Sequence, residues 1–371
     1  VNVTLAANSA VNLNGDGSLG DIKKSGSVAG TAVVLGGNNG TQKVGVVDVA
    51  TFNQVGGNVT TTGAITATEI NVNGVLNAGG NVTTSTLEVV DGALNAAGKD
   101  ITVSGSTAAK IFGDVEASSL SLSGGALIAG GADVKLDSLT GANNTNIQVG
   151  EDREGGLGAT VTTTNLVLSG GSIFVDPDWH KPAGFVVTEN LSNAGSTTSG
   201  SGTLDGKAYV GKNAALGIGF AKTDAGLAEL KALVAPYLVD NGGFAENGVK
   251  NALVINDSVN VASGNGFVVD HELTSDNYKN NKPENKIVLG AGAALVVTDK
   301  ALDEGASAAI TFANTTASLT AGDGAKVVLV GDFTAADKGQ KIFAANNGSA
   351  KVTGTVKVEA AGGLLVGQIT D

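Results

Sequence analysis

Apolar and polar residues alternate along most of the chain, in short segments separated by glycine. Leu87–Val103 reads LEVVDGALNAAGKDITV and Leu120–Leu136 reads LSLSGGALIAGGADVKL, and the two align without a gap. Leu166–Asp176 (LVLSGGSIFVD) carries the first ten positions of this pattern, with Ser172 in place of the alanine. A period of two residues places successive side chains on opposite faces of a β-strand. Each segment therefore predicts a strand, a turn at a glycine and a second strand.

The spacing of these copies indicates stacked coils. Strands of the Leu-x-Val/Leu type begin at residues 70, 87, 120 and 166, so the first step is about one coil long and the later two are about two coils each. Unequal steps argue against a strict six-residue left-handed β-helix. They favour an all-β fold, a right-handed parallel β-helix, in which turn lengths vary while the strands stack. The predicted inward-facing residues are Leu87, Val89, Leu120, Leu122, Leu166 and Leu168.

The pattern predicts one solenoid over residues 1–371 rather than several globular domains. Regular coils are expected over 1–175 and again over 287–371, where Ile287–Thr298 (IVLGAGAALVVT) restores the strand, glycine turn and strand. Larger excursions are expected over 176–286. A coil exposes apolar surface to both neighbours, so it is stable only inside a stack.

One short α-helix is predicted near residues 223–235. Leu227, Leu230 and Val234 fall on one face at helical spacing, and Asp224 is the expected N-cap.

Composition narrows the class of protein. Aromatic residues make up only 4% of the chain, so its core must be built from Val, Leu, Ile and Ala. The net charge is −13 and Arg153 is the single arginine, which argues against nucleic-acid binding. Cysteine is absent, so neither disulfides nor thiolate metal sites are expected. No apolar run is long enough for a transmembrane helix, and the lack of Met at position 1 suggests a processed or excised segment.

Catalytic motifs are missing, and one loop stands out as a possible ligand contact. Asp176, Asp178, Trp179 and His180 lie within seven residues that also contain two of the four prolines. A tryptophan flanked by carboxylates resembles a sugar platform or a small acid–base cluster. The alternative, which we favour, is that Trp179 pins an excursion onto the solenoid. The second histidine, His271, is expected to be a solvated loop residue.

Acidic residues elsewhere do not predict a metal site. Asn12, Asn14 and Asp16 copy the front half of a calcium loop, but Lys23 occupies the place of the required bidentate glutamate. A turn is therefore expected there. The pair Glu151 and Asp152 lacks the repetition on consecutive coils that a glycosidase cleft would need. We expect no cofactor and no metal.

Taken together, the Leu-x-Leu-x-Gly-Gly-x-Leu strands, the Asn/Thr/Gly-rich coils, the scarce arginine and the absent cysteine resemble the passenger region of bacterial type V autotransporters, pertactin-like in style. The resemblance is in strand pattern and composition rather than in any single diagnostic motif, and it covers nearly the whole chain. It implies a right-handed β-helix on the outer surface of a Gram-negative cell, serving adhesion, autoaggregation or biofilm formation. The chain lacks the translocator barrel of that family, so tethering to, or release from, a barrel removed from this segment is expected.

Three functions remain open. The first is a non-catalytic extracellular module that contacts a host glycan, a matrix protein or another copy of itself. The second is a self-assembling filament or surface-layer subunit. The third is a polysaccharide-active enzyme that would use Asp176 and Asp178, and the missing repetition of carboxylates disfavours it.

Overall fold

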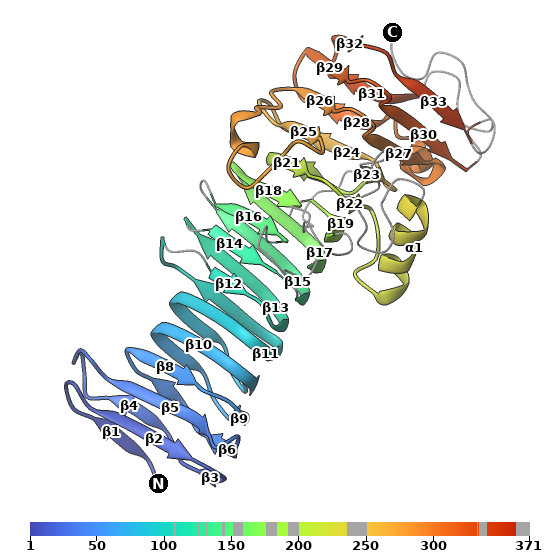
Figure 1. Ribbon diagram of the computed structural model, residues 1–371. Helices are drawn as coiled ribbons and strands as arrows, with labels where there is room; N and C mark the ends of the chain where they lie inside the picture. Colours follow the sequence, from blue (N-terminus) through green and yellow to red (C-terminus); the bar gives the residue numbers. More distant parts are fainter. Residues whose placement is uncertain are drawn as a thin grey trace. The chain divides into compact units, whose positions relative to one another are not determined.

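The structure is a computed structural model of the chain. It describes residues 1–106, 109–124, 126–130, 132–142, 145–150, 159–175, 184–191, 200–235, 251–331, 333 and 340–360. The chain divides into two compact units, Val1–Thr145 (unit 1) and Asn146–Asp371 (unit 2). Both are built mainly from parallel strands (Figure 1), and each is described separately.

Unit 1 consists of short strands joined by tight turns, followed by longer strands that run through the turns. The strands are β1 (Val3–Leu5), β2 (Ala10–Asn14), β3 (Gly17–Ser18), β4 (Ile22–Lys24), β5 (Ala32–Gly37), β6 (Thr41–Val44), β7 (Val47–Asp48), β8 (Thr51–Gln54), β9 (Asn58–Thr61), β10 (Ile65–Asn77), β11 (Val82–Val103), β12 (Ala109–Ile111), β13 (Asp114–Ser123), β14 (Ala126–Ala129) and β15 (Asp133–Ala142).

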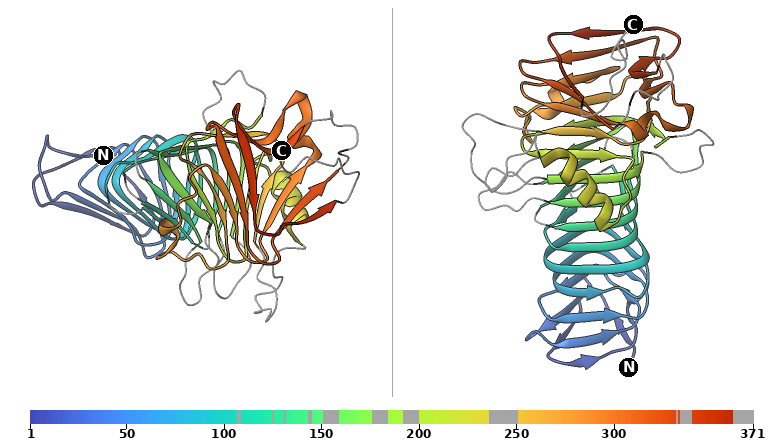
Figure 2. Two further views of the ribbon diagram at one scale, coloured as in Figure 1. Left: turned by 90° about the horizontal axis from the view of Figure 1, so that it is seen from above. Right: turned by 90° about the vertical axis from the view of Figure 1, so that its right-hand side faces the viewer.

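Each of the first six strands pairs in parallel with the third strand after it. Thus β1 pairs with β4 and then β7, β2 with β5 and then β8, and β3 with β6 and then β9. Three strands therefore make one coil, and the coils stack into three sheet faces. The right-hand view of Figure 2 shows these strands as successive levels. This is the all-β, parallel, solenoid-like arrangement that the alternation predicts.

Inward side chains form columns, one behind each face of unit 1. Paired positions place Ile70 over Phe52 and Leu87 over Ile70 in one column, and Leu94 over Leu76 in another. All of these side chains are fully buried. The predicted inward residues Leu87, Val89, Leu120 and Leu122 of unit 1 are likewise buried, which confirms the side-chain alternation.

The gap-free sequence alignment does not match the stacking register. Leu120 pairs with Ile101 on one side and with Leu139 on the other. Leu87 pairs with Ile70, and its neighbour Glu88 lies opposite Lys110. Leu87 and Leu120 therefore belong to different faces, and the expected two-coil step between them is wrong. Strands of all three faces share one alternation, so they align with each other in sequence without lying over each other.

A line of glycines marks one corner of unit 1. Gly74 pairs with Gly92, and both have positive φ, +133° and +80°. A Cβ on Gly74 would lie 2.7 Å from the carbonyl oxygen of Gly57, and one on Gly92 would collide with the carbonyl of Gly74. The corner therefore needs glycine both for its backbone conformation and for the close approach of successive coils.

Buried carboxamide side chains form hydrogen bonds with backbone groups of unit 1. Carboxamide side chains on its surface form hydrogen bonds with one another. The buried Gln42 donates to the carbonyl oxygens of Leu13 and Gly15 and accepts from the N–H of Gly36, at 2.7 to 2.8 Å. On the surface an asparagine ladder links three coils. Its members are Asn58, Asn77 and Asn95, with Nδ2 of each later residue 2.9 Å from Oδ1 of the one before.

In its described residues, unit 2 contains shorter strands, one α-helix and two 3-10 segments. The elements are β16 (Asn146–Val149), β17 (Thr160–Ser169), β18 (Gly171–Val175), β19 (Gly184–Asn190), β20 (Thr203–Leu204), β21 (Gly206–Val210), β22 (Ala214–Ile218), α1 (Asp224–Val234), β23 (Ala252–Ile255), β24 (Val259–Val261), β25 (Gly266–Val269), η2 (Tyr278–Asn280), β26 (Lys286–Leu289), β27 (Ala294–Thr298), η3 (Asp299–Gly305), β28 (Ala308–Phe312), β29 (Thr316–Ala321), β30 (Lys326–Val330), β31 (Lys341–Ala345), β32 (Ser349–Thr353) and β33 (Lys357–Ala360).

These strands again form three parallel faces. The first is β16–β18–β21–β25–β26–β29–β32, the second β17–β19–β22–β23–β27–β30–β33, and the third β20–β24–β28–β31. Leu166 and Leu168, the remaining predicted inward residues, are buried. Unit 2 therefore keeps the coil plan while adding segments outside it.

The predicted helix is present as α1, and its cap differs by one residue from the prediction. Oγ1 of Thr223 accepts from the N–H of Gly226 at 3.3 Å, so Thr223 is the N-cap and Asp224 is the first helical residue. Leu230 and Val234 are buried and Leu227 is partly buried against the same apolar cluster. The helix lies on the outside of the second face (Figure 2). None of the helices in the described residues is long and apolar enough to cross a membrane.

Candidate functional site on the outer surface of unit 2

The predicted ligand-contact residues, Asp176, Asp178, Trp179 and His180, lie outside the described residues, as do Glu151 and Asp152. The prediction that this loop contacts a ligand or pins an excursion therefore stays a prediction. The described residues offer a second candidate, the segment Asp270–Asn285 between β25 and β26, which we call the excursion.

The excursion is anchored on the outside of the first face by an aromatic cluster. Phe174 of β18 stacks on Tyr278 of η2 with ring centroids 4.4 Å apart and planes 22° apart. Tyr209 of β21 meets Tyr278 edge to face at 5.1 Å and 68°. Val268 of β25 and Leu273 complete the cluster. Offset and edge-to-face rings attract one another beyond the area that they bury, so this cluster fixes the excursion to the sheet.

The strand register brings the two sheet aromatics together. Phe174 pairs with Tyr209, and Tyr209 pairs with Val268, so all three project from adjacent strands on the outer face. Outward positions of a solvated sheet would be polar. Apolar residues follow one another without alternation at Ile173–Val175 (IFV) and Ala208–Val210 (AYV), which indicates strands that are covered on both faces. Our prediction from the sequence considered only the inward-facing residues and so did not include the covered outer face.

A buried phenol ties the cluster to the return path of the excursion. The O–H of Tyr209 donates to the carbonyl oxygen of Asn281 at 2.8 Å. Burial, with the nearby Tyr278 as a smaller cause, raises the pKa of Tyr209 to about 12. The phenol therefore remains protonated, and able to donate this hydrogen bond, to a higher pH than an exposed tyrosine.

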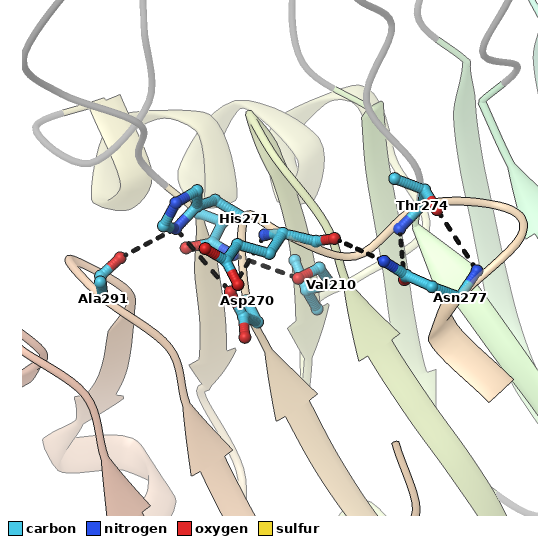
Figure 3. Close-up of polar contacts among 8 residues, drawn as sticks. Val210, Asp270, His271, Thr274, Asn277 and Ala291 are labelled. Atoms are coloured by element: carbon cyan, nitrogen blue, oxygen red, sulfur yellow. Dashed lines mark hydrogen bonds and ion pairs between the residues drawn. The ribbon is translucent and has the colours of Figure 1, made fainter. Parts of the chain in front are cut away.

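His271 lies at the start of the excursion beside Asp270 (Figure 3). Its Nδ1 is 3.2 Å from the carbonyl oxygen of Ala291 and 3.8 Å from Oδ1 of Asp270. Oδ1 of Asp270 also accepts from the N–H of Glu272 at 3.0 Å. The imidazole is 26% exposed, so the predicted solvated histidine is in a loop but partly covered. These contacts orient a loop, because the partners of the ring are a backbone carbonyl and a carboxylate.

The next turn of the excursion is closed by Thr274 and Asn277 (Figure 3). Oδ1 of Asn277 accepts from the N–H of Thr274 at 2.8 Å, and Oγ1 of Thr274 accepts from the N–H of Asn277 at 3.3 Å. Nδ2 of Asn277 donates to the carbonyl of Glu272 at 2.9 Å. Side-chain and backbone groups satisfy one another here, which is the arrangement of an ordered surface loop.

The acidic clusters do not gather into a metal centre in the described residues. No group of three or more His, Cys, Asp or Glu side chains in that part of the chain is placed to hold a metal ion. Asn12 and Asn14 of the calcium-like segment lie in β2, and the predicted turn is at Gly15 and Asp16, where Oδ1 of Asp16 accepts from the N–H of Thr41 at 2.7 Å. Lys23 lies in β4 and forms an ion pair with Asp21, with Nζ and Oδ2 2.7 Å apart.

Comparison of the chain with protein-family models, with curated proteins and with solved structures finds no match. The class of the protein therefore rests on its own geometry, that of an all-β, parallel, solenoid-like chain whose second unit has a helix and an anchored excursion on its outer surface.

Proposed function

We propose that this chain is a non-catalytic, extracellular binding module of the autotransporter-passenger type, which contacts glycans, matrix proteins or copies of itself through the outer faces of its coils. The observation that carries the proposal is the stacking of outward positions in register on successive strands. The asparagine ladder (Asn58, Asn77 and Asn95) exemplifies it, because the same polar group recurs at the strand spacing of about 4.8 Å. A surface of repeated groups suits a repeating or extended partner.

The winding of the coils is, on this proposal, right-handed. Parallel strands joined by a crossover in one sheet are nearly always connected with this hand, because of the right-handed twist of the strands. The resemblance to autotransporter passengers supports the same hand. It also supports a location on the outer surface of a Gram-negative cell, tethered to or released from an outer-membrane barrel.

Bead adhesion tests the proposal directly. Beads that carry the whole chain are presented to surfaces coated with acidic glycans, neutral glycans and matrix proteins, and the retained fraction is compared with albumin-coated beads. We expect retention on at least one coating. Clumping of the beads in suspension would instead favour self-association, the second function. If the beads are not retained on any coating and do not clump, the binding-module proposal is wrong.

A further inference from the structure

Three lysines lie in one outward row on the first face of unit 2. The register pairs Lys207 with Gly266, Gly266 with Lys286, Lys286 with Ser318 and Ser318 with Lys351. The five positions come from β21, β25, β26, β29 and β32, which follow one another in the stack (Figure 1). Residues far apart in the sequence thus place a positive charge on every second strand. We call Lys207, Lys286 and Lys351 the lysine row.

The spacing of the row follows from sheet geometry. Neighbouring strands lie about 4.8 Å apart, so the Cα atoms of consecutive row lysines are about 9.5 Å apart. The position between the first two lysines is Gly266, which is buried, and a Cβ there would collide with the backbone carbonyl oxygens of Lys286 and of Pro283 in the excursion. The position between the last two is Ser318, a hydroxyl-bearing residue. The row therefore carries evenly spaced charges, with a covered glycine between the first two lysines and a partly exposed serine between the last two.

The lysine row is not neutralised within the part of the chain that the structure describes. None of its three ammonium groups makes an ion pair there. The nearby carboxylates in the sequence are Asp205 and Glu284, and Asp205 accepts instead from Nδ2 of Asn265 at 3.4 Å. Three unpaired lysines in register are unexpected in a chain with a net charge of −13.

On the adjacent face, by contrast, two stacked lysines are neutralised by a glutamate of the same chain. Lys326 pairs with Lys357 in the ladder, and Glu359 binds both, at 3.1 Å and 2.8 Å. Hydrogen bonds from Lys357 and then from Lys326 hold the pKa of the Glu359 carboxyl below its ordinary value. The lysine row has no such acid, so its charges are available to an external anion.

We propose that the lysine row binds a linear anionic polysaccharide whose charged groups recur about every 9.5 Å, the interval of alternate strands. This inference rests on the proposed binding function and names its ligand class. Lysine presents a compact point charge that can pair with a single carboxylate, sulfate or phosphate group, so the spacing of the row selects the polymer. Nucleic-acid phosphates are spaced more closely, about 3.4 Å along each strand of a duplex, so they match the row poorly.

A matched pair of triple variants tests the inference. One variant carries Lys207→Gln, Lys286→Gln and Lys351→Gln. The control carries K43Q, K99Q and K110Q, which remove the same three charges from unit 1. These lysines are partly or fully exposed and are not aligned in one row. The probe is hyaluronan, which has one carboxylate per disaccharide, measured by calorimetry on the whole chain at low and at physiological ionic strength. Dextran and duplex DNA are the comparison polymers.

We expect the row variant to raise the Kd for hyaluronan about tenfold, equivalent to about 1.4 kcal/mol, while the control changes it less than about twofold. Glu284→Gln should tighten binding, because it removes a neighbouring negative charge. Circular dichroism and thermal unfolding of each variant establish that it is folded.

Three outcomes would overturn the inference. They are no binding of hyaluronan by the unaltered chain, equal losses in the row and control variants, and tighter binding of DNA than of hyaluronan. Bead adhesion separates this failure from failure of the proposed function. If beads carrying the row variant adhere as well as unaltered beads, the proposed binding function is retained and the role of the lysine row is refuted.

Discussion

Gly74 and Gly92 lie side by side in the stack of unit 1, and their backbone conformations and close contacts fix the path of one corner. At the residue scale, such positions tolerate only glycine, whereas outward strand positions accept many polar residues. A glycine with positive φ but open surroundings allows the effect of backbone conformation to be measured apart from the effect of close contact. Gly98 is such a position, with φ of +68° and no atom within 4 Å of a would-be Cβ.

Gly92→Ala should therefore destabilise unit 1 more than Gly98→Ala. Both substitutions force an alanine into a left-handed conformation, which costs about 1–2 kcal/mol. Only the first also drives a methyl group into the carbonyl of Gly74, which adds about 1–3 kcal/mol of overpacking. Urea unfolding monitored by circular dichroism measures both. Equal midpoints for the two variants would contradict the close-contact explanation.

Tyr209 gives a pH-dependent prediction at the same scale. Burial raises the pKa of its phenol from 10.0 to about 12 in the folded chain, so between these values the unfolded chain loses the proton first. Stability from this group is full below pH 10 and is lost as the pH rises to about 12. Tyr209→Phe should remove this part of the alkaline loss.

The measurement is the urea midpoint at intervals between pH 9 and pH 12, for the unaltered chain and the phenylalanine variant. Absorbance of phenolate as the folded chain is titrated provides a second readout. A phenylalanine variant with the same alkaline dependence would show that Tyr209 does not carry it.

Residue patterns in the sequence predicted the buried leucines but not the aromatic cluster. Leu87 and Leu120 alternate with polar neighbours, so a local pattern suffices to place them inward. Tyr278 reaches Phe174 only through the path of the excursion, and no periodicity encodes that path. The Asp176–His180 candidates lie outside the described residues, so the structure leaves that prediction untested.

At the scale of elements, the helix shows both the strength and the limit of sequence reasoning. Helical spacing of apolar residues located α1, because one buried face is enough to define the period. Its cap was misplaced by one residue, since Thr223 and Asp224 are both good capping residues and only the backbone distinguishes them. Extended φ and ψ at Thr223 (−88° and 164°) make it the cap.

Thr223→Ala should lower the free energy of unfolding by about 1 kcal/mol, because the N–H of Gly226 loses its side-chain acceptor. Thr223→Ser retains a hydroxyl and should restore most of that loss. Asp224→Ala tests the competing assignment, and we expect a smaller effect from it. If Asp224→Ala were more costly than Thr223→Ala, the cap would have to be reassigned.

At the scale of the whole molecule, the coil plan was predictable and its register was not. Alternation predicts stacked parallel strands, and the paired columns confirm it. Alignment of similar segments failed to give the register because Leu87 and Leu120 occupy different faces that share one pattern. Because each coil has three similar strands, sequence comparison aligns strands of different faces and does not give the number of residues per coil.

A charge inside a column should affect coils beyond its immediate neighbours. Leu76 is fully buried between Val59 and Leu94, whereas the adjacent Val75 is partly exposed on the outer surface. Leu76→Asp should abolish protection of amides across several coils of unit 1, because each coil is stable only against its neighbours. Val75→Asp should leave protection nearly intact. Hydrogen exchange with mass spectrometry distinguishes the two.

The interval between paired positions varies from coil to coil while the columns stay in line. Leu76 is matched by Leu94 and Leu94 by Val115, so a longer connection enters between them without displacing either side chain. Mutation can therefore lengthen or replace a connecting segment while the interior remains unchanged. A lineage of such chains is free to vary its outer surface, and a protein engineer can graft foreign peptides at the same places.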